Sequence, residues 1–401
     1  MAPARTPAST DRRRFPRWRR VLASGVPLAL VVALAIGWPV PEPDVDAWRR
    51  RVVAEGPHDA RSTYWIGHSL VDGVDPHVAS PTNVVDKVDR LAASLGLEHR
   101  AFRQTSWGAP LSLHVRGRSH APGREEPSLP ARLEELREHG ARYDVLLLTD
   151  TVPLSSARRW EHTDFHATEL ACELWRQRPD ARVVLHETWV SLQLPPESDD
   201  PRGWSFVDQI ARERVEVERA AAAISTGAVI EPGPFGRVTR WFRSAAPCRA
   251  PSAVTVAPVG SCLARLSEEL ARDPSWELRI TDFFVNPRLG ATDPPGRRGQ
   301  PPTDPPRRRG QPPTDPPGWG DDAPARFTEL PLRHPEEPFD DVHASDLGVY
   351  FSALVHFATI FGRDPSGAPS MAEGVDDTTA TRLGRFAWSC VRDDPAAGVT
   401  R

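Results

Sequence analysis

The chain has 401 residues, of which 50 are Lys or Arg and 54 are Asp or Glu, so its formal net charge is −4. With 39% hydrophobic residues it can bury a sizeable core. Roughly 300 residues remain for one large folded domain once the N-terminal and Pro-rich segments are set aside. Basic residues gather in residues 1–20 and the remainder is mildly acidic, which excludes the basic face that nucleic-acid binding needs. No nucleic-acid partner is expected.

The N-terminal region has the pattern of an export signal or membrane anchor. A basic leader, residues 1–20, precedes the uncharged apolar run Val21–Val40, which is long enough to cross a bilayer. The basic flank predicts a cytoplasmic N-terminus. Two interpretations remain open: a signal peptide cleaved near Ala33-Leu34-Ala35, or an uncleaved anchor that makes the membrane a partner. Both predict that the following chain lies outside the cytoplasm, in the periplasm or cell envelope, anchored at the inner membrane or secreted.

After a polar linker expected over residues 41–60, strand patterns alternate with helix patterns. The expected strands are Ser62–Gly67, His99–Gln104, Tyr143–Leu148, Ala181–His186 and Ala253–Pro258. The expected helices are Asn83–Leu95, Leu129–Glu138, Ala157–Arg178, Phe206–Ile224, Cys262–Ala271, Ala344–Phe361 and Thr378–Val391. A Gly/Pro/His-rich loop is expected over about residues 108–128. The alternation predicts an α/β fold with a parallel sheet and crossover helices.

A tandem repeat interrupts this pattern. Thr-Asp-Pro-Pro-Gly-Arg-Arg-Gly-Gln-Pro-Pro at 292–302 recurs with one change at 303–313 and begins again at Thr314. Such a segment predicts a disordered or polyproline-like loop over 291–320, inserted into a domain formed by 61–290 and 321–395. Its arginines and prolines could bind an anionic polymer or a proline-recognising domain. The alternative is a duplicated and tolerated surface insertion.

The four cysteines show no metal-ligand spacing. In an oxidising compartment Cys248 and Cys262 could bridge a short loop. Isolated thiols packed as small hydrophobic side chains are the alternative.

The first candidate for chemistry is Gly67-His68-Ser69-Leu70, at the end of the first expected strand. A serine on a tight strand-to-helix turn presents its hydroxyl at the carboxyl edge of the sheet. Backbone N–H groups there can stabilise an oxyanion. Taken alone, the pattern also fits a serine that merely caps a helix.

The second candidate is Asp340-Asp341-Val342-His343, before the last helices. An Asp three residues before a His lets the carboxylate orient the imidazole, which can then remove a proton from a nucleophile. A helix-capping role is again the alternative.

Together, and in this order, the two blocks resemble the SGNH/GDSL hydrolase family. The resemblance extends to the segment from His343 to Tyr350, and within the family to a bacterial subgroup with Gly-His-Ser-Leu at the nucleophile. The subgroup likeness includes Glu187-Thr188-Trp189, Pro258-Val259-Gly260 and the tail through Ala387-Trp388, and it spans about residues 62–395.

The resemblance implies a three-layer α/β/α sandwich with a central parallel sheet, similar to flavodoxin, and ester hydrolysis through a covalent acyl-enzyme. It assigns Ser69 as nucleophile, His343 as general base and then acid, and Asp340 as the residue that orients His343. Asp341 has the wrong spacing for that role. The assignment requires neither cofactor nor metal.

In the family the oxyanion is bound by the serine N–H, a glycine N–H after the second strand and an asparagine after the third. Ser69 and Gly108 fit the first two roles. The third strand is followed by Thr149 and Asp150, with no asparagine. Thr149 can donate a hydrogen bond, but an ionised Asp150 beside an oxyanion would repel it. Loss of one donor typically costs about 10²–10³-fold in rate.

Two histidine patterns have alternative explanations. His162 and His166 are four residues apart with Asp164 between them, as in a metal pair, yet no third ligand follows with suitable spacing, which favours an exposed polar helix face. His68 either lines the substrate site or shapes the turn that holds Ser69.

The sequence therefore predicts an extracytoplasmic serine esterase acting on an acylated glycan or a small acyl ester. One alternative is an O-acyltransferase that uses the same Ser69, His343 and Asp340 to acylate envelope glycans. Another is a catalytically impaired glycan-binding protein, suggested by the missing asparagine and the 13 tryptophans.

Overall fold

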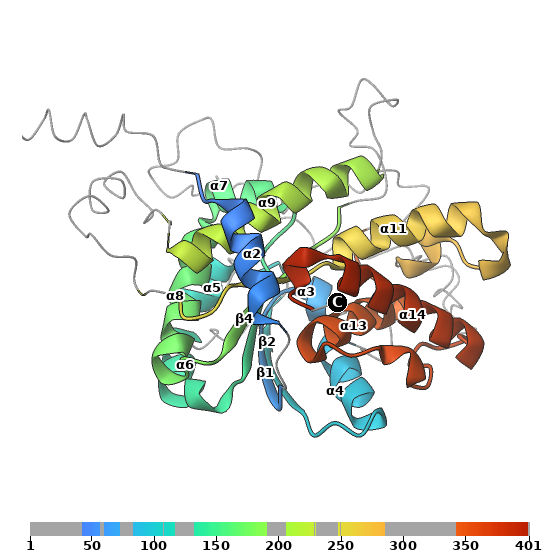
Figure 1. Cartoon of the computed structure of the whole chain (residues 1–401), viewed down its shortest axis with the longest axis horizontal. Coiled ribbons are helices and arrows are strands. Elements are labelled where there is room, and N and C mark those ends of the chain that lie inside the picture. Colours follow the sequence, from blue (N-terminus) through green and yellow to red (C-terminus); the bar gives the residue numbers. More distant parts are fainter. Residues whose placement is uncertain are drawn as a thin grey trace, which may run out of the picture.

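The computed structural model describes residues 42–56, 60–72, 83–106, 108–116, 132–190, 206–227, 229, 248, 250–284 and 342–399. Within these ranges five parallel strands form one sheet in the order β2-β1-β3-β4-β5. Helices cover both faces of this sheet (Figure 1). The prediction of an α/β fold with a central parallel sheet between two helical layers is confirmed.

The strands are β1 Ser62–Gly67, β2 Arg100–Thr105, β3 Val145–Leu148, β4 Arg182–His186 and β5 Thr255–Ala257. The first helices are α2 Val45–Glu55, α3 Ser69–Asp72, α4 Val84–Ser94, α5 Leu111–Arg116, α6 Arg132–His139 and α7 Leu154–Trp160. The later helices are α8 Thr163–Gln177, α9 Phe206–Thr226, α11 Val259–Arg272, α13 Asp346–Phe361 and α14 Asp377–Asp393.

The strand order reverses at β1. From β1 the chain first adds β2 on one side, and then crosses to the other side for β3, β4 and β5. In open α/β sheets such a reversal leaves a crevice outside the carboxyl ends of the two strands concerned, and ligands bind there. Here those ends are Gly67 of β1 and Leu148 of β3.

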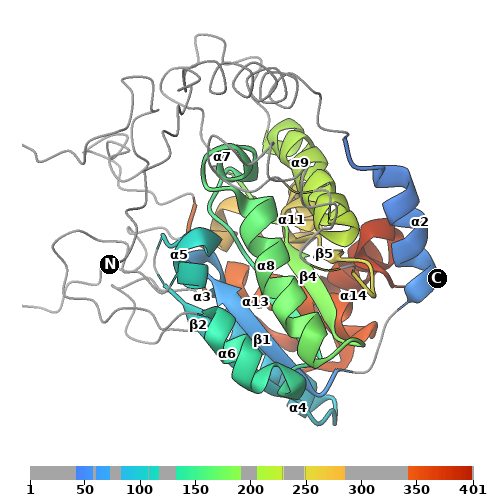
Figure 2. The same ribbon diagram turned by 90° about the vertical axis from the view of Figure 1, so that its left-hand side faces the viewer.

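Successive side chains of each strand point to opposite layers, as a pleated strand requires. Tyr64 and Ile66 pack in the core that includes α8 and α9, whereas Trp65 packs in the core of α4, α11, α13 and α14. Figure 2 shows α6, α8 and α9 in front of the sheet and α13 and α14 behind it. Every residue of α13 from Gly348 to Phe361 is buried, which explains the apolar character of this segment.

The structure differs from the expected elements at three places. Residues 45–55, expected within a linker, form α2, because Trp48 and Val52 bury an apolar edge and Trp48 Nε1 donates to Val254 O at 2.8 Å. The loop expected over 108–128 contains α5. The helix expected over 157–178 is two helices, α7 and α8, separated where His162 takes a left-handed φ of 56°.

All four cysteines form disulfides, Cys172 with Cys248 and Cys262 with Cys390. The Cys248–Cys262 bridge considered from the sequence is wrong, and so is the alternative of isolated thiols. Cys248 packs in the layer that contains α8, and Cys262 lies in the layer that contains α13. The sheet separates the two layers, so each cysteine bonds to a partner in its own layer.

Several predicted features lie outside the described residues: the leader 1–20, the run Val21–Val40, the repeat segment 291–320 and Asp340. Among the residues that the structure does describe, no helix is both long and apolar enough to cross a membrane.

The disulfides close segments of 76 and 128 residues. Crosslinks over loops of this length stabilise a fold by about 4–5 kcal/mol each in the chain-entropy model. We therefore expect reduction, or the pair Cys262→Ser/Cys390→Ser, to lower the thermal unfolding midpoint markedly. Calorimetry with and without reductant measures this change. Free thiols detected in the unfolded, unreduced protein would contradict the presence of the two disulfides.

Candidate active site

The turn after β1 places Ser69 at the carboxyl edge of the sheet. β1 ends at Gly67, and Ser69 begins the short helix α3. A Cβ on Gly67 would lie 2.8 Å from Cβ of Thr149, so only glycine lets the ends of β1 and β3 approach this closely. Ser69 is largely buried in this turn, with 7% of its surface exposed.

His68 holds this turn instead of facing the solvent. Its Nε2 lies 2.7 Å from Asp150 O, and Leu70 N donates weakly to Nδ1 at 3.4 Å. A carbonyl can only accept and an amide can only donate, so these partners favour a neutral ring with the proton on Nε2. Burial lowers the pKa of His68 to about 4. Of the two roles expected for His68, the contacts favour shaping the turn.

The structure brings Ser69 and His343 together. Ser69 Oγ lies 3.0 Å from His343 Nε2, across a sequence separation of 274 residues. This is the distance at which an imidazole can accept the hydroxyl proton of a nucleophile. With Nε2 directed at Ser69, Nδ1 is the nitrogen that a carboxylate would orient. Asp340, assigned to that role by the resemblance, lies outside the described residues.

Two aromatic residues hold the backbone on either side of His343. Trp189, which is fully buried, donates from Nε1 to Val342 O at 2.7 Å. Ala344 pairs with Phe284 through an isolated antiparallel bridge. The rings of Trp189 and Phe284 pack edge to face, with centroids 6.3 Å apart.

The start of α13 also holds the backbone segment that contains His343. Ser345 caps the helix by accepting from Gly348 N at 3.2 Å, and its own N–H donates to Phe283 O at 3.0 Å. A Cβ on Gly348 would approach Phe283 O to 2.0 Å, which no other residue could tolerate without movement. The N-terminus of α13 is thus seated against residues 282–284, and His343 is placed just before it.

The three predicted oxyanion donors follow three adjacent strands. Gly108 comes after β2 with a left-handed φ of 60°, and Ser106 N donates to Gly67 O at 3.1 Å to hold this loop beside β1. Thr149 follows β3 and is buried against Gly67, and its N–H is bound by Ile66 O at 2.9 Å. The side-chain hydroxyl is therefore the donor that Thr149 can contribute. These donor roles remain predictions.

One oxygen of the Asp150 carboxylate accepts from two backbone N–H groups. Its Oδ1 accepts from Leu111 N at 3.2 Å, at the start of α5, and from Thr151 N at 2.8 Å. Burial raises the pKa of Asp150, which favours the uncharged form. The repulsion expected between an ionised Asp150 and an oxyanion is weakened by both effects.

His162 and His166 occupy different positions relative to α8. His162 precedes the helix, whereas His166 is 2% exposed and places Nδ1 3.0 Å from Glu169 Oε2. The expected exposed face is therefore wrong for His166. In the described part of the chain, no group of three or more His, Cys, Asp or Glu side chains could hold a metal ion.

Sequence patterns did not indicate a second, buried histidine pair. His186 Nδ1 at the end of β4 lies 2.7 Å from His356 Nε2 on α13, and the two rings are stacked. The ring of His186 also packs edge to face on Trp189, with centroids 5.9 Å apart. Trp189 belongs to a segment of the family likeness, but its bond to Val342 depends on tertiary packing and has no sequence signal.

No family model matches the chain, and no curated protein does. Among solved structures, a DUF4886 family protein from Bacteroides uniformis has 11% identity and a TM-score of 0.38, over 82% of this chain and 94% of that one. A proposed arylesterase from Agrobacterium tumefaciens has 14% identity and a TM-score of 0.29, over 54% and 99%. The periplasmic domain of a lipopolysaccharide acetyltransferase from Salmonella ser. Paratyphi A has 13% identity and a TM-score of 0.27, over 51% and 78%.

Acid should destabilise the fold through its buried histidines. Burial lowers the pKa of His68 and of His114 to about 4, and that of His356 to about 3. Above pH ~6.5 neither the folded nor the unfolded state is protonated, so the shifts have no effect there. Below it only the unfolded chain gains the proton, so stability is lost as the pH falls towards the folded-state pKa. For a folded-state pKa of about 4, the loss at pH 5 is about 2 kcal/mol per histidine.

We expect the unfolding free energy from denaturant titration to decrease between about pH 7.5 and about pH 5. His114→Gln should make this decrease smaller, because glutamine does not titrate. Burial raises the pKa of Asp150 and Glu187, which acts in the opposite direction but equally in both proteins. An identical pH dependence for the two proteins would contradict the expectation.

Proposed function

We propose that the chain is a serine ester hydrolase in which Ser69 is the nucleophile and His343 its base. The observation that carries the proposal is the 3.0 Å contact between Ser69 Oγ and His343 Nε2. It lies at the strand-order reversal of a parallel sheet, where open α/β sheets place their ligands. The resemblance to SGNH/GDSL hydrolases predicted the same two residues from separate motifs.

In the proposed reaction, Ser69 Oγ attacks the ester carbonyl carbon while its proton passes to His343 Nε2. The resulting oxyanion is bound by Ser69 N–H, Gly108 N–H and the Thr149 hydroxyl. The bond to the alcohol oxygen then breaks, and His343 gives its proton to the leaving alcohol. Water attacks the acyl-enzyme with His343 again as base, which releases the acid and restores Ser69.

Asp340 completes the proposed catalytic unit by orienting His343 through Nδ1 and stabilising the imidazolium. For the substrate we propose an acylated glycan or a small acyl ester, with removal of O-acetyl groups as the most concrete form. The two disulfides are typical of oxidising compartments, which supports action outside the cytoplasm. An O-acyltransferase would use the same residues with a sugar hydroxyl in place of water.

A fluorophosphonate probe tests the nucleophile directly. We expect the wild type to be labelled and Ser69→Ala to be unlabelled, because the probe forms its bond with the activated serine oxygen. His343→Ala should slow hydrolysis of short acyl esters by roughly 10⁴-fold or more. Ser267→Ala is the control, since this serine lies on α11 and its hydroxyl bonds to Ala264 O. Equal labelling of wild type and Ser69→Ala would refute the proposal.

The neighbouring aspartates provide a matched test of the third member. We expect Asp340→Asn to lower kcat by about 10⁴-fold while Asp341→Asn changes it less than about tenfold, because only the first has the spacing to orient His343. Both variants lose one negative charge, so a general electrostatic effect would act on both. The reverse order of effects would transfer the role to Asp341.

Product analysis separates hydrolysis from acyl transfer. The released acid is measured from a short acyl ester with and without a sugar acceptor. A hydrolase gives the same acid yield in both conditions. If acylated sugar forms in place of free acid when the acceptor is present, the protein is an acyltransferase.

A further inference from the structure

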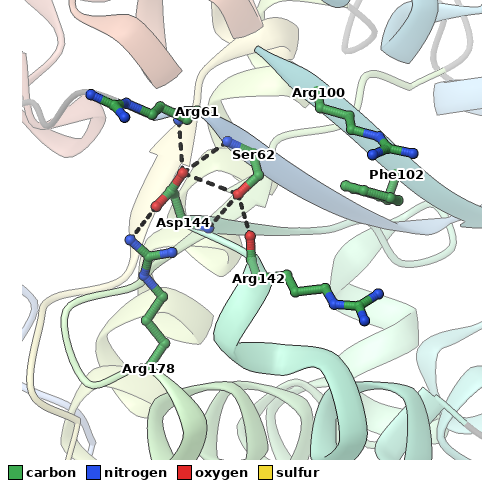
Figure 3. Close-up of a pocket in the computed structure, with 7 residues that line it drawn as sticks. All are labelled: Arg61, Ser62, Arg100, Phe102, Arg142, Asp144 and Arg178. Carbon is green, nitrogen blue, oxygen red and sulfur yellow. Dashed lines mark hydrogen bonds and ion pairs between the residues drawn. The ribbon is translucent and has the colours of Figure 1, made fainter. Parts of the chain in front are cut away.

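A second surface feature lies at the opposite edge of the sheet from Ser69. A pocket of about 500 Å³ opens where β1, β2 and β3 begin, and Figure 3 shows the side chains around it. Its lining residues are Arg61, Ser62, Arg100, Phe102, Arg142, Asp144 and Arg178. Four of these side chains are cationic and one is anionic, in a chain whose formal net charge is −4.

The single carboxylate of the pocket is already saturated. Asp144 Oδ2 accepts from Arg61 N at 2.7 Å, from Ser62 N at 2.8 Å and from Ser62 Oγ at 3.0 Å. Its Oδ1 pairs with Arg178. Asp144 therefore neutralises one guanidinium and ties together the strand ends that form the pocket floor.

Within the described residues, the other three arginines have no carboxylate partner. Arg61, Arg100 and Arg142 are exposed, and none of them forms an ion pair with a carboxylate among the residues that the structure describes. Figure 3 shows the guanidiniums of Arg100 and Arg142 on one side of Ser62 and that of Arg61 on the other side. Carboxylate and phosphate groups match the guanidinium fork through two parallel hydrogen bonds.

Two of the cationic side chains are held in position before any ligand binds. The Arg100 guanidinium stacks on Phe102 at 4.8 Å from the ring centroid, and Phe102 packs edge to face on the buried ring of Tyr143 at 5.3 Å. Stacking leaves the N–H donors of Arg100 available. Arg178 is held by Asp144. Ser62 Oγ also lies 2.5 Å from Arg142 O, the nearer of two acceptors for its one hydroxyl proton, and this contact ties the backbone of Arg142 to β1.

We propose that this pocket binds a ligand bearing phosphate groups. Three guanidiniums without a described carboxylate partner suit a multiply charged anion better than a single carboxylate. The volume lies within the range of small-ligand pockets and exceeds what one inorganic phosphate fills. The phosphate can belong to a free phosphorylated small molecule or to a phosphate-bearing polymer. Binding at this edge is independent of the function proposed for Ser69.

The test compares two triple variants of the full chain that remove equal charge. The pocket variant is Arg61→Gln/Arg100→Gln/Arg142→Gln. The control variant is Arg90→Gln/Arg212→Gln/Arg385→Gln. The control arginines are also exposed and form no ion pair with a described carboxylate, but they lie on α4, α9 and α14.

Calorimetric titrations with inorganic pyrophosphate and with long-chain polyphosphate measure the binding. We expect the pocket variant to bind at least tenfold more weakly than wild type, and the control variant to differ by less than twofold. Weaker pyrophosphate binding in the pocket variant but not in the control variant indicates a small phosphorylated ligand. If only polyphosphate binding weakens in the pocket variant, the ligand is a phosphate-bearing polymer. Equal losses in the two variants, or no saturable binding of either anion by wild type, would overturn the proposal.

Discussion

The hydrogen bond between Ser69 Oγ and His343 Nε2 sets the strictest demand on this fold, because it joins side chains that are 274 residues apart. A bond of 3.0 Å requires two backbone segments to be placed within a few tenths of an ångström. On one side, Gly67 allows β1 to approach Thr149 closely, and His68 Nε2 binds the backbone carbonyl of Asp150. On the other side, Trp189 and Phe284 hold the residues before and after His343. The geometry depends on contacts from β3, β4 and α13, as well as on the two motifs.

Burial shifts the titration of the polar groups around this edge towards their uncharged forms. Burial lowers the pKa of His68 and His356 and raises the pKa of Asp150. Neutral groups fit an apolar core at a smaller cost than charged ones. They also fix donor and acceptor directions, because a neutral imidazole has one of each. Directed hydrogen bonds, such as that between His68 Nε2 and the Asp150 carbonyl, thus help to fix the geometry of this edge.

Local sequence patterns predicted the structural features that depend on neighbouring residues in the chain. The alternation of apolar runs and helices identified the parallel sheet, and the strand-end serine and the Asp-x-x-His block indicated which side chains meet. The cysteine pairing was not predictable in this way, because it depends on which face of the sheet each helix covers. The division between α7 and α8 rests on one left-handed residue, His162, with no glycine to signal it. The support from Trp189 requires tertiary packing across 153 residues.

The bridge between Phe284 and Ala344 also bears on how this chain can change in length. It brings both ends of the intervening stretch, which includes the 11-residue duplication, to neighbouring points on the domain. When the two ends of a segment are held at neighbouring points, the entropy cost of closing the chain between them grows only logarithmically with its length. A change in the number of repeat units therefore leaves the bridge beside His343 in place. Homologous chains would then vary in size at this point and remain constant in the geometry beside it.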